Sequence, residues 1–219
     1  MAAQHPGRRP GRPAHRHRRR PAGHRRHTRR VTGRPPVRPS GTTQLEDCVL
    51  SIAHHFTETF HAEHREVRDL LLALIDAFTG GDAAQVRKLV EALSAAIGPH
   101  FRYEEEAMYP GLKPVFGAHY MDKLLSDHDD TIRNIRELAE LAETAEVDTL
   151  GTIGENQAAW GIALVREILP HLSDCDGLSL MVETLPEDDV VHILATREVA
   201  REINADVLTW AGTLRARRV

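Results

Sequence analysis

The sequence predicts an all-α protein, with an up-down-up-down four-helix bundle, a C-terminal helical extension and a disordered basic N-terminal tail. Aromatic residues make up only 5% of the 219 residues, whereas Ala, Leu, Glu and Arg are abundant, a composition that favours helices over strands. Apolar residues recur every three or four positions, and no segment alternates as a half-buried strand would. Four long periodic segments joined by short connections indicate a helix bundle.

Residues 1–40 form the predicted tail. They hold 13 Arg and no acidic residue, and they offer almost nothing that a core could bury, so we expect disorder. The rest of the chain carries 15 basic and 32 acidic side chains, a formal net charge of −17. A basic tail can bind nucleic-acid phosphates. We prefer a solvated tail, a tail lying on the acidic bundle, or upstream sequence translated from a misassigned start codon.

The cysteine count and the hydropathy pattern predict a cytoplasmic protein. The two cysteines, Cys48 and Cys175, are far apart and form no disulfide framework. No apolar run approaches the roughly 18 residues that a membrane span needs. The N-terminus lacks the apolar stretch of a secretory signal. We therefore expect no membrane partner.

The first two helices are delimited by capping and breaking residues. Thr43-Gln44-Leu45-Glu46 reads as a capping box that opens the first helix. That helix runs to about Phe78 and ends at Gly80-Gly81. Asp82 caps the second helix, and we expect Pro110-Gly111 to stop it.

The third helix is predicted over residues 118–144, and a second capping box, Thr152-Ile153-Gly154-Glu155, precedes the fourth. Pro186 breaks the chain after the fourth helix, and one further helical segment follows it. The predicted domain comprises residues 43–219, with the bundle core at 45–185 and the helical extension at 187–215.

One motif in the second predicted helix carries the chemistry. His100 and Glu104 are four residues apart, so both side chains leave the same helix face one turn apart. An imidazole and a carboxylate so placed can hold one metal ion, or the carboxylate can bridge two. A partial copy begins at Pro170-His171 and has Cys175 where the glutamate would be.

Each of the four helices also carries a histidine near its middle: His64, His100, His128 and His171. Since neighbouring antiparallel helices meet midway along their lengths, we expect the four imidazoles at one level of the core. Neutral imidazole suits iron, zinc, copper and manganese. Several His and Glu side chains left without a ligand among Leu and Ile would be costly, so the pattern favours a metal site.

On these residues the chain resembles hemerythrin-like proteins of the HHE cation-binding class. The resemblance covers about residues 45–185, and its most specific part is the phrase His-Phe-x-x-Glu-Glu-x-x-x-Tyr-Pro at 100–110. It implies a non-heme, oxygen-bridged di-iron centre, in preference to zinc or manganese. Carried over by position, the implied metal ligands are His64, His100, Glu104, His128 and His171.

The sequence departs from that family at two places. Ile132 stands where hemerythrins have a second third-helix histidine, which puts oxygen carriage in doubt. Many HHE proteins have Glu four residues after the fourth-helix histidine, where this chain has Cys175, whereas hemerythrins proper have Asp five residues after, here Asp176. Position i+5 is rotated by about 140°, so Asp176 needs a local distortion, which Pro170 and Gly177 favour. We prefer Asp176 as the sixth ligand. Cys175 is then a small buried residue, a soft ligand or a redox thiol.

The resemblance implies a protein that binds or senses a small diatomic gas, such as oxygen or nitric oxide, or peroxide. A redox enzyme that removes peroxide or repairs iron–sulfur clusters is the first alternative, with Tyr103 and Tyr109 as candidate proton donors. The second is a regulatory or interaction module that folds only with metal. Glu105 and Glu106 are read as a solvated face or as partners of a ligating imidazole.

Overall fold

The computed structural model describes residues 51–144 and 152–215, and these residues are helical apart from short connections. Within these ranges the only strand-like pairing is an isolated bridge between Asp82 and Thr152. The all-α prediction is therefore confirmed for the described residues. The predicted tail at 1–40 and the predicted capping box at 43–46 lie outside them.

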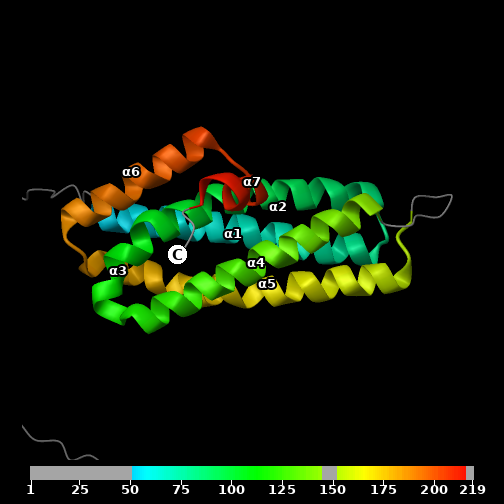
Figure 1. Cartoon of the computed structure of the whole chain (residues 1–219), viewed down its shortest axis with the longest axis horizontal. Helices are drawn as coiled ribbons and strands as arrows, with labels where there is room; N and C mark the ends of the chain where they lie inside the picture. Colours follow the sequence, from blue (N-terminus) through cyan, green and yellow to red (C-terminus); the bar gives the residue numbers. More distant parts are fainter. Residues whose placement is uncertain (1–50, 145–151, 216–219) are drawn as a thin grey trace, which may run out of the picture. The chain divides into compact units, whose positions relative to one another are not determined.

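Four long helices run side by side in the bundle (Figure 1). Helix α1 packs against α2 and α5, and α4 packs against the same two helices, so the four close a ring. This packing agrees with a four-helix bundle, and the up-down-up-down order stays a prediction. The helices are α1 (Ile52–Thr79), α2 (Ala83–Tyr103), α4 (Ala118–Thr144) and α5 (Glu155–Met181).

The second helix does not stop at Pro110-Gly111, so that prediction is wrong. Helix α2 leads directly into the π-helix η1 (Glu104–Met108) and then into α3 (Tyr109–Phe116). Pro110 lies in the first turn of α3, and because the helix continues through η1 its missing N–H leaves a gap in the helical hydrogen bonds at this junction. The N–H of Tyr109 bonds to the carbonyl of Glu104, and this wider turn is of a kind often found at functional sites.

The predicted cap at Asp82 is confirmed, because its side chain accepts a hydrogen bond from the N–H of Gln85. The predicted capping box before α5 is wrong. Helix α5 begins at Glu155 with Gly154 as its cap and no side-chain hydrogen bond. Thr152 instead pairs with Asp82 across the same end of the bundle, so its backbone is extended and lies two residues too early to cap the helix.

The C-terminal extension is divided into two pieces, where the sequence predicted one helical segment. The 3₁₀ turn η2 (Val182–Thr184) joins α5 to α6 (Glu187–Ile203). Asn204 ends α6 in the left-handed conformation, with φ 48°, which asparagine tolerates better than most residues. The short α7 (Val207–Thr209) and the π-helix η3 (Trp210–Leu214) follow.

The extension covers one side of the bundle. Helix α6 packs on α1 and α2, and α7 packs on α2 and α4 (Figure 1). Gly98 of α2 permits this close approach, because a Cβ atom at that position would lie 2.1 Å from the carbonyl oxygen of Ala205. Any larger residue would push the segment after α6 away from the bundle.

Two apolar clusters fill the interior, and the buried histidines lie where they meet. Phe101, from one cluster, stacks on His128 with ring centroids 3.6 Å apart. Phe60, from the other, lies 4.2 Å from the ring centroid of His64. In the described part of the chain, no helix combines the length and apolar character that a bilayer span requires.

Candidate metal centre

Five polar side chains are buried in the middle of the bundle, each at most 6% exposed. The ring formed by α1, α2, α4 and α5 contributes one histidine from each helix, and the π-helix η1 contributes a glutamate. Burial of this many ionisable groups in an apolar core is unfavourable unless they find partners. The residues are His64, His100, Glu104, His128 and His171.

The five side chains form two groups of potential ligands that share one carboxylate. His64, His100 and Glu104 each offer one ligand atom within 4.8 Å of the others. Glu104, His128 and His171 satisfy the same criterion. The structure thus brings together five of the six residues that the sequence singled out, and it places Glu104 between two pairs of histidines.

Glu104 has the environment expected of a residue that binds a cation. Its side chain is fully buried, and neither carboxylate oxygen has a hydrogen-bond partner of suitable geometry. The nearest cationic candidates are Nε2 of His100, 3.5 Å from Oε1, and Nε2 of His128, 3.2 Å from Oε2. Burial raises the pKa of Glu104 to about 7, although His100 opposes this. A divalent cation at each oxygen would offset this cost.

The two nearest imidazoles also fit a shared cation. Nε2 of His64 lies 2.9 Å from Nε2 of His100. Two nitrogens bound at right angles to one ion, each at about 2.1 Å, would be about 3 Å apart. Burial, followed by the charge of His100, lowers the pKa of His64 to about 2. Burial in the same way lowers the pKa of His171 to about 4, so both rings stay neutral and able to bind a metal.

Carboxylates outside the groups set the orientation of two imidazoles. Nδ1 of His100 lies 3.0 Å from Oε2 of Glu63, and Nδ1 of His128 lies 2.9 Å from Oε1 of Glu105. An Nδ1–H that donates to a carboxylate leaves the Nε2 lone pair directed inward, the arrangement found around metal-bound histidine. Tyr103 strengthens the first contact by donating its hydroxyl hydrogen to Oε2 of Glu63 at 2.8 Å.

Asp176, the sixth predicted ligand, lies outside both groups. Its Oδ1 is 2.7 Å from Nδ1 of His64, and its side chain is 43% exposed. Helix α5 is α-helical throughout from Glu155 to Met181, with Pro170 inside it, and it has no π or 3₁₀ turn between Pro170 and Gly177. On a regular helix Asp176 is turned away from His171 and meets the outer edge of His64, as Glu63 meets that of His100.

His171 differs from the other three histidines in its partner. Its Nε2 and Nδ1 atoms lie 3.4 and 3.8 Å from Sγ of Cys175, and within the described residues no carboxylate binds either nitrogen. Cys175 is fully buried, and burial raises its pKa well above the usual range. The hydroxyl of Tyr109 lies 3.6 Å from the sulfur and 3.0 Å from Nε2 of His128.

Glu63 is a contributor to the site to which the sequence assigned no role. A weak signal exists, since Glu63 directly precedes His64 and therefore points about 100° away from it, toward a neighbouring helix. For Glu105 the sequence allowed two interpretations, a solvated face or a partner of a ligating imidazole. Its contact with His128 agrees with the second. Glu106, by contrast, lies in η1 and pairs with Arg102 of α2.

Comparison with known proteins agrees with this geometry. A family model, the hemerythrin HHE cation-binding domain, matches residues 55–177. This is more than half of the chain, and it includes all six residues singled out in the sequence. The chain belongs to the hemerythrin HHE cation-binding family. No curated protein and no solved structure showed a significant match.

Membership of the hemerythrin HHE family indicates a metal-binding protein, and iron is the typical metal of such domains. The two buried groups of His and Glu side chains fit that role. The match ends at residue 177, and α6, α7 and η3 lie beyond the matched part of the chain.

Proposed function

We propose that this hemerythrin-like protein holds a non-heme di-iron centre and binds or senses a diatomic gas or peroxide. His64 and His100 bind one iron ion, and His128 and His171 bind the other. Glu104 bridges the two. Asp176 supports His64 by contacting its Nδ1 atom at 2.7 Å, and in this proposal it is not a direct ligand.

The observation that carries this proposal is the state of Glu104. A fully buried carboxylate with two oxygens lacking hydrogen-bond partners, each facing the Nε2 atom of a different histidine, suits a bridge between two cations. A single structural zinc would use four ligands in one closed tetrahedron, whereas here five candidate ligands fall into two overlapping groups.

Iron bound here would supply a coordination position for oxygen, nitric oxide or peroxide. The chain surrounds that position with apolar and proton-holding groups. Burial raises the pKa of Tyr109 well above its usual range, so its hydroxyl keeps a proton 3.0 Å from Nε2 of His128. Ile132 is buried on α4, one turn after His128, and offers no ligand atom.

A surface pocket supports access by a small ligand. The pocket has a volume of about 430 Å³ and is lined by His64, Asp176 and the two arginines Arg65 and Arg68, among others. It lies at the outer side of the first group. A diatomic molecule or peroxide in this pocket would lie beside the contact between Asp176 and His64.

Metal analysis together with an optical spectrum of the purified protein tests the proposal. We expect about two iron ions per chain and absorption bands of an oxygen-bridged pair. Adding oxygen, nitric oxide or peroxide separately to the reduced protein then identifies the ligand from the spectral change. One zinc ion per chain, or no change with any of the three ligands, would contradict the proposal.

Peroxide removal is the second candidate function, and the position of Tyr109 favours it. Its hydroxyl is a proton donor inside the site rather than beside it. If the centre turns over peroxide, Tyr109→Phe should slow consumption while leaving iron content unchanged. Tyr120, which stacks on Phe116 and is hydrogen-bonded to none of the five buried candidate ligands within the described part of the chain, provides the matched control as Tyr120→Phe. Consumption no faster than that of free iron would rule out this candidate.

A further inference from the structure

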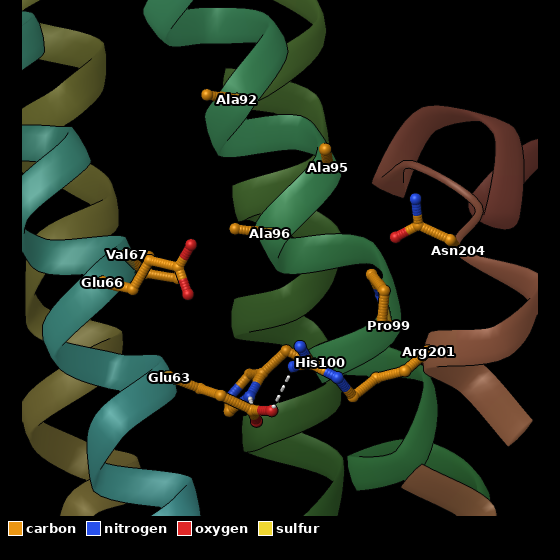
Figure 2. A pocket seen from close by; sticks show the side chains of 10 residues that line it. All are labelled: Glu63, Glu66, Val67, Ala92, Ala95, Ala96, Pro99, His100, Arg201 and Asn204. Carbon is orange, nitrogen blue, oxygen red and sulfur yellow. Dashed lines mark hydrogen bonds and ion pairs between the residues drawn. The ribbon is translucent and has the colours of Figure 1, made fainter. Parts of the chain in front are cut away.

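Three arginines of the C-terminal extension contact the carboxylates that orient the buried imidazoles. Arg197 and Arg201 lie on α6, and Arg215 directly follows η3. All three lie beyond residues 55–177, the part that matches the family. Figure 2 shows Arg201 reaching from α6 to Glu63 beside His100.

The carboxylate of Glu63 is held from both sides. Its Oε1 accepts hydrogen bonds from Nε and Nη2 of Arg197, at 2.9 and 2.7 Å, and from Nη1 of Arg201 at 3.0 Å. Its Oε2 accepts from Nδ1 of His100 at 3.0 Å and from the hydroxyl of Tyr103 at 2.8 Å. The arginines therefore fix the oxygen that the histidine does not use, and with it the plane of the carboxylate.

The carboxylate of Glu105 is held in a similar way on the other side of the site. Arg215 donates from Nε to Oε2 at 2.9 Å and from Nη2 to Oε1 at 2.7 Å, a two-pronged contact of fixed geometry. The same Oε1 atom of Glu105 also accepts a hydrogen bond from Nδ1 of His128 at 2.9 Å. The guanidinium of Arg215 has two further partners. Its Nη1 atom lies 2.6 Å from Oδ1 of Asp129, and its Cζ atom lies 5.4 Å from the ring centroid of Trp210.

These ion pairs are not the only contacts that dock the extension. Apolar contacts also do so, through the buried side chains of Val190, Ile193, Val207 and Trp210 and the close approach at Gly98. The paired side chains Glu63 and Arg197 are each only 12% exposed. Ion pairs at such burial contribute little net stability, because desolvation offsets the attraction. Their geometric effect on the carboxylates remains.

We propose that the C-terminal extension positions the two halves of the metal centre separately, each through its own arginines. This inference rests on the proposed function. Arg197 and Arg201 act on the His64–His100 half through Glu63, and Arg215 acts on the His128–His171 half through Glu105. The arginines touch no metal and no substrate. They are positioning residues, which keep each carboxylate where it holds an imidazole with Nε2 directed inward.

Binding of Fe²⁺ to the full-length, metal-free chain under anaerobic conditions, in competition with a chelator, tests this inference. His64→Ala leaves the second group intact, and His171→Ala leaves the first. In the His64→Ala chain, Arg215→Gln should weaken Fe²⁺ binding about 10- to 100-fold, whereas the double change Arg197→Gln and Arg201→Gln should not. In the His171→Ala chain the pattern should reverse.

Arg133→Gln is the matched control, since Arg133 pairs with Asp130 at the surface and contacts none of the carboxylates that bind an imidazole. Arg215→Lys keeps the charge but loses the two-pronged contact, so we expect an intermediate loss. Arg215→Lys also replaces Arg215→Gln in the test if the glutamine variant folds poorly. Equal affinities in the arginine variants and the control would overturn the inference while leaving the proposed function intact. If the unsubstituted chain binds no Fe²⁺, both are overturned.

Discussion

At the residue scale, the site depends on a single carboxylate that belongs to both groups of ligands. Glu104 has an oxygen toward His100 and an oxygen toward His128, and neither oxygen has a hydrogen bond. A side chain in this position is costly to the metal-free fold, and its value lies in the cations that it can join.

Glu104→Gln keeps the volume and removes the charge. We expect the iron content to fall to one ion per chain or fewer, because the bridging oxygen pair is lost. The metal-free variant should unfold at the same or a higher denaturant concentration, because a buried carboxylate is replaced by a neutral amide that costs less to desolvate. Metal analysis and urea unfolding measure the two effects. Glu106→Gln, in η1 and paired with the side chain of Arg102, should change neither, and full iron occupancy in Glu104→Gln would refute the bridging role.

The roles of Asp176 and Cys175 separate in a second pair of variants. Asp176→Ala removes a support of His64, so we expect weaker iron binding in the first half, by about 10- to 100-fold. Cys175→Ser keeps the size of a buried side chain that belongs to neither group, so we expect unchanged iron content. Chelator competition compares the two variants. The reverse order of effects would make the thiol the ligand.

The contacts between the site residues could be predicted from sequence only in part. Four histidines at the middle of four helices, with Glu104 one turn after His100, indicate a buried metal site by spacing alone. Asp176 was harder, since a five-residue spacing shows that it points away from His171 but not that it meets His64. The partner of a side chain on another helix depends on helix rotation, which periodicity fixes only roughly.

At the element scale, the extension is held against α2 by a short segment with its own cap. The side chain of Asp206 accepts hydrogen bonds from the N–H groups of Leu208 and Thr209 and from the hydroxyl of Thr209. Burial acts to raise the pKa of Asp206, but these hydrogen bonds outweigh it and the pKa is lowered.

Asp206→Ala should reduce the free energy of unfolding by about 1 kcal/mol, the usual cost of losing a cap. Because the pKa is lower in the folded state, this contribution is complete above about pH 4 and is lost as the pH falls below it. The gap between the wild type and the variant should therefore narrow from pH 6 to pH 3 in urea unfolding. Asp122→Ala, at an exposed position on α4, should show no comparable gap at either pH.

Helix ends were predicted well where a single side chain caps them and poorly where a proline intervenes. The cap at Asp82 depends only on its own side chain. Pro110 permits two outcomes, a stop or a first-turn position, and the preceding π turn selects the second. The break at Asn204 has no strong local signal, because asparagine occurs both inside helices and at their ends.

At the scale of the whole molecule, metal binding should stabilise the fold. Any ion that binds only the folded chain adds about 2.7 kcal/mol when its free concentration is 100 times the dissociation constant. Chelation should therefore lower the unfolding temperature, and readdition of Fe²⁺ should restore it. Calorimetry measures this change in unfolding temperature for the wild type and for Glu104→Gln. We expect the smaller change in the variant. Identical shifts would show that the stabilising ion binds elsewhere.

The tail is predicted to be dispensable for the metal centre. A chain that begins at Thr42 should bind the same number of iron ions with the same affinity, since every candidate ligand lies at or after His64. Metal analysis of the shortened and full-length chains checks this. Reduced iron content in the shortened chain would assign the arginine-rich segment a part in the site.

The sharing of Glu104 between the two groups has a thermodynamic consequence. When one carboxylate serves two ions, filling either group changes the charge and the rotamer that the other group meets. The affinity for the second ion then depends on the first, and the factor is the same whichever group fills first. If the proposed pair of ions binds, the two halves would therefore load as one cooperative unit, described by the two binding constants together with a coupling free energy between them.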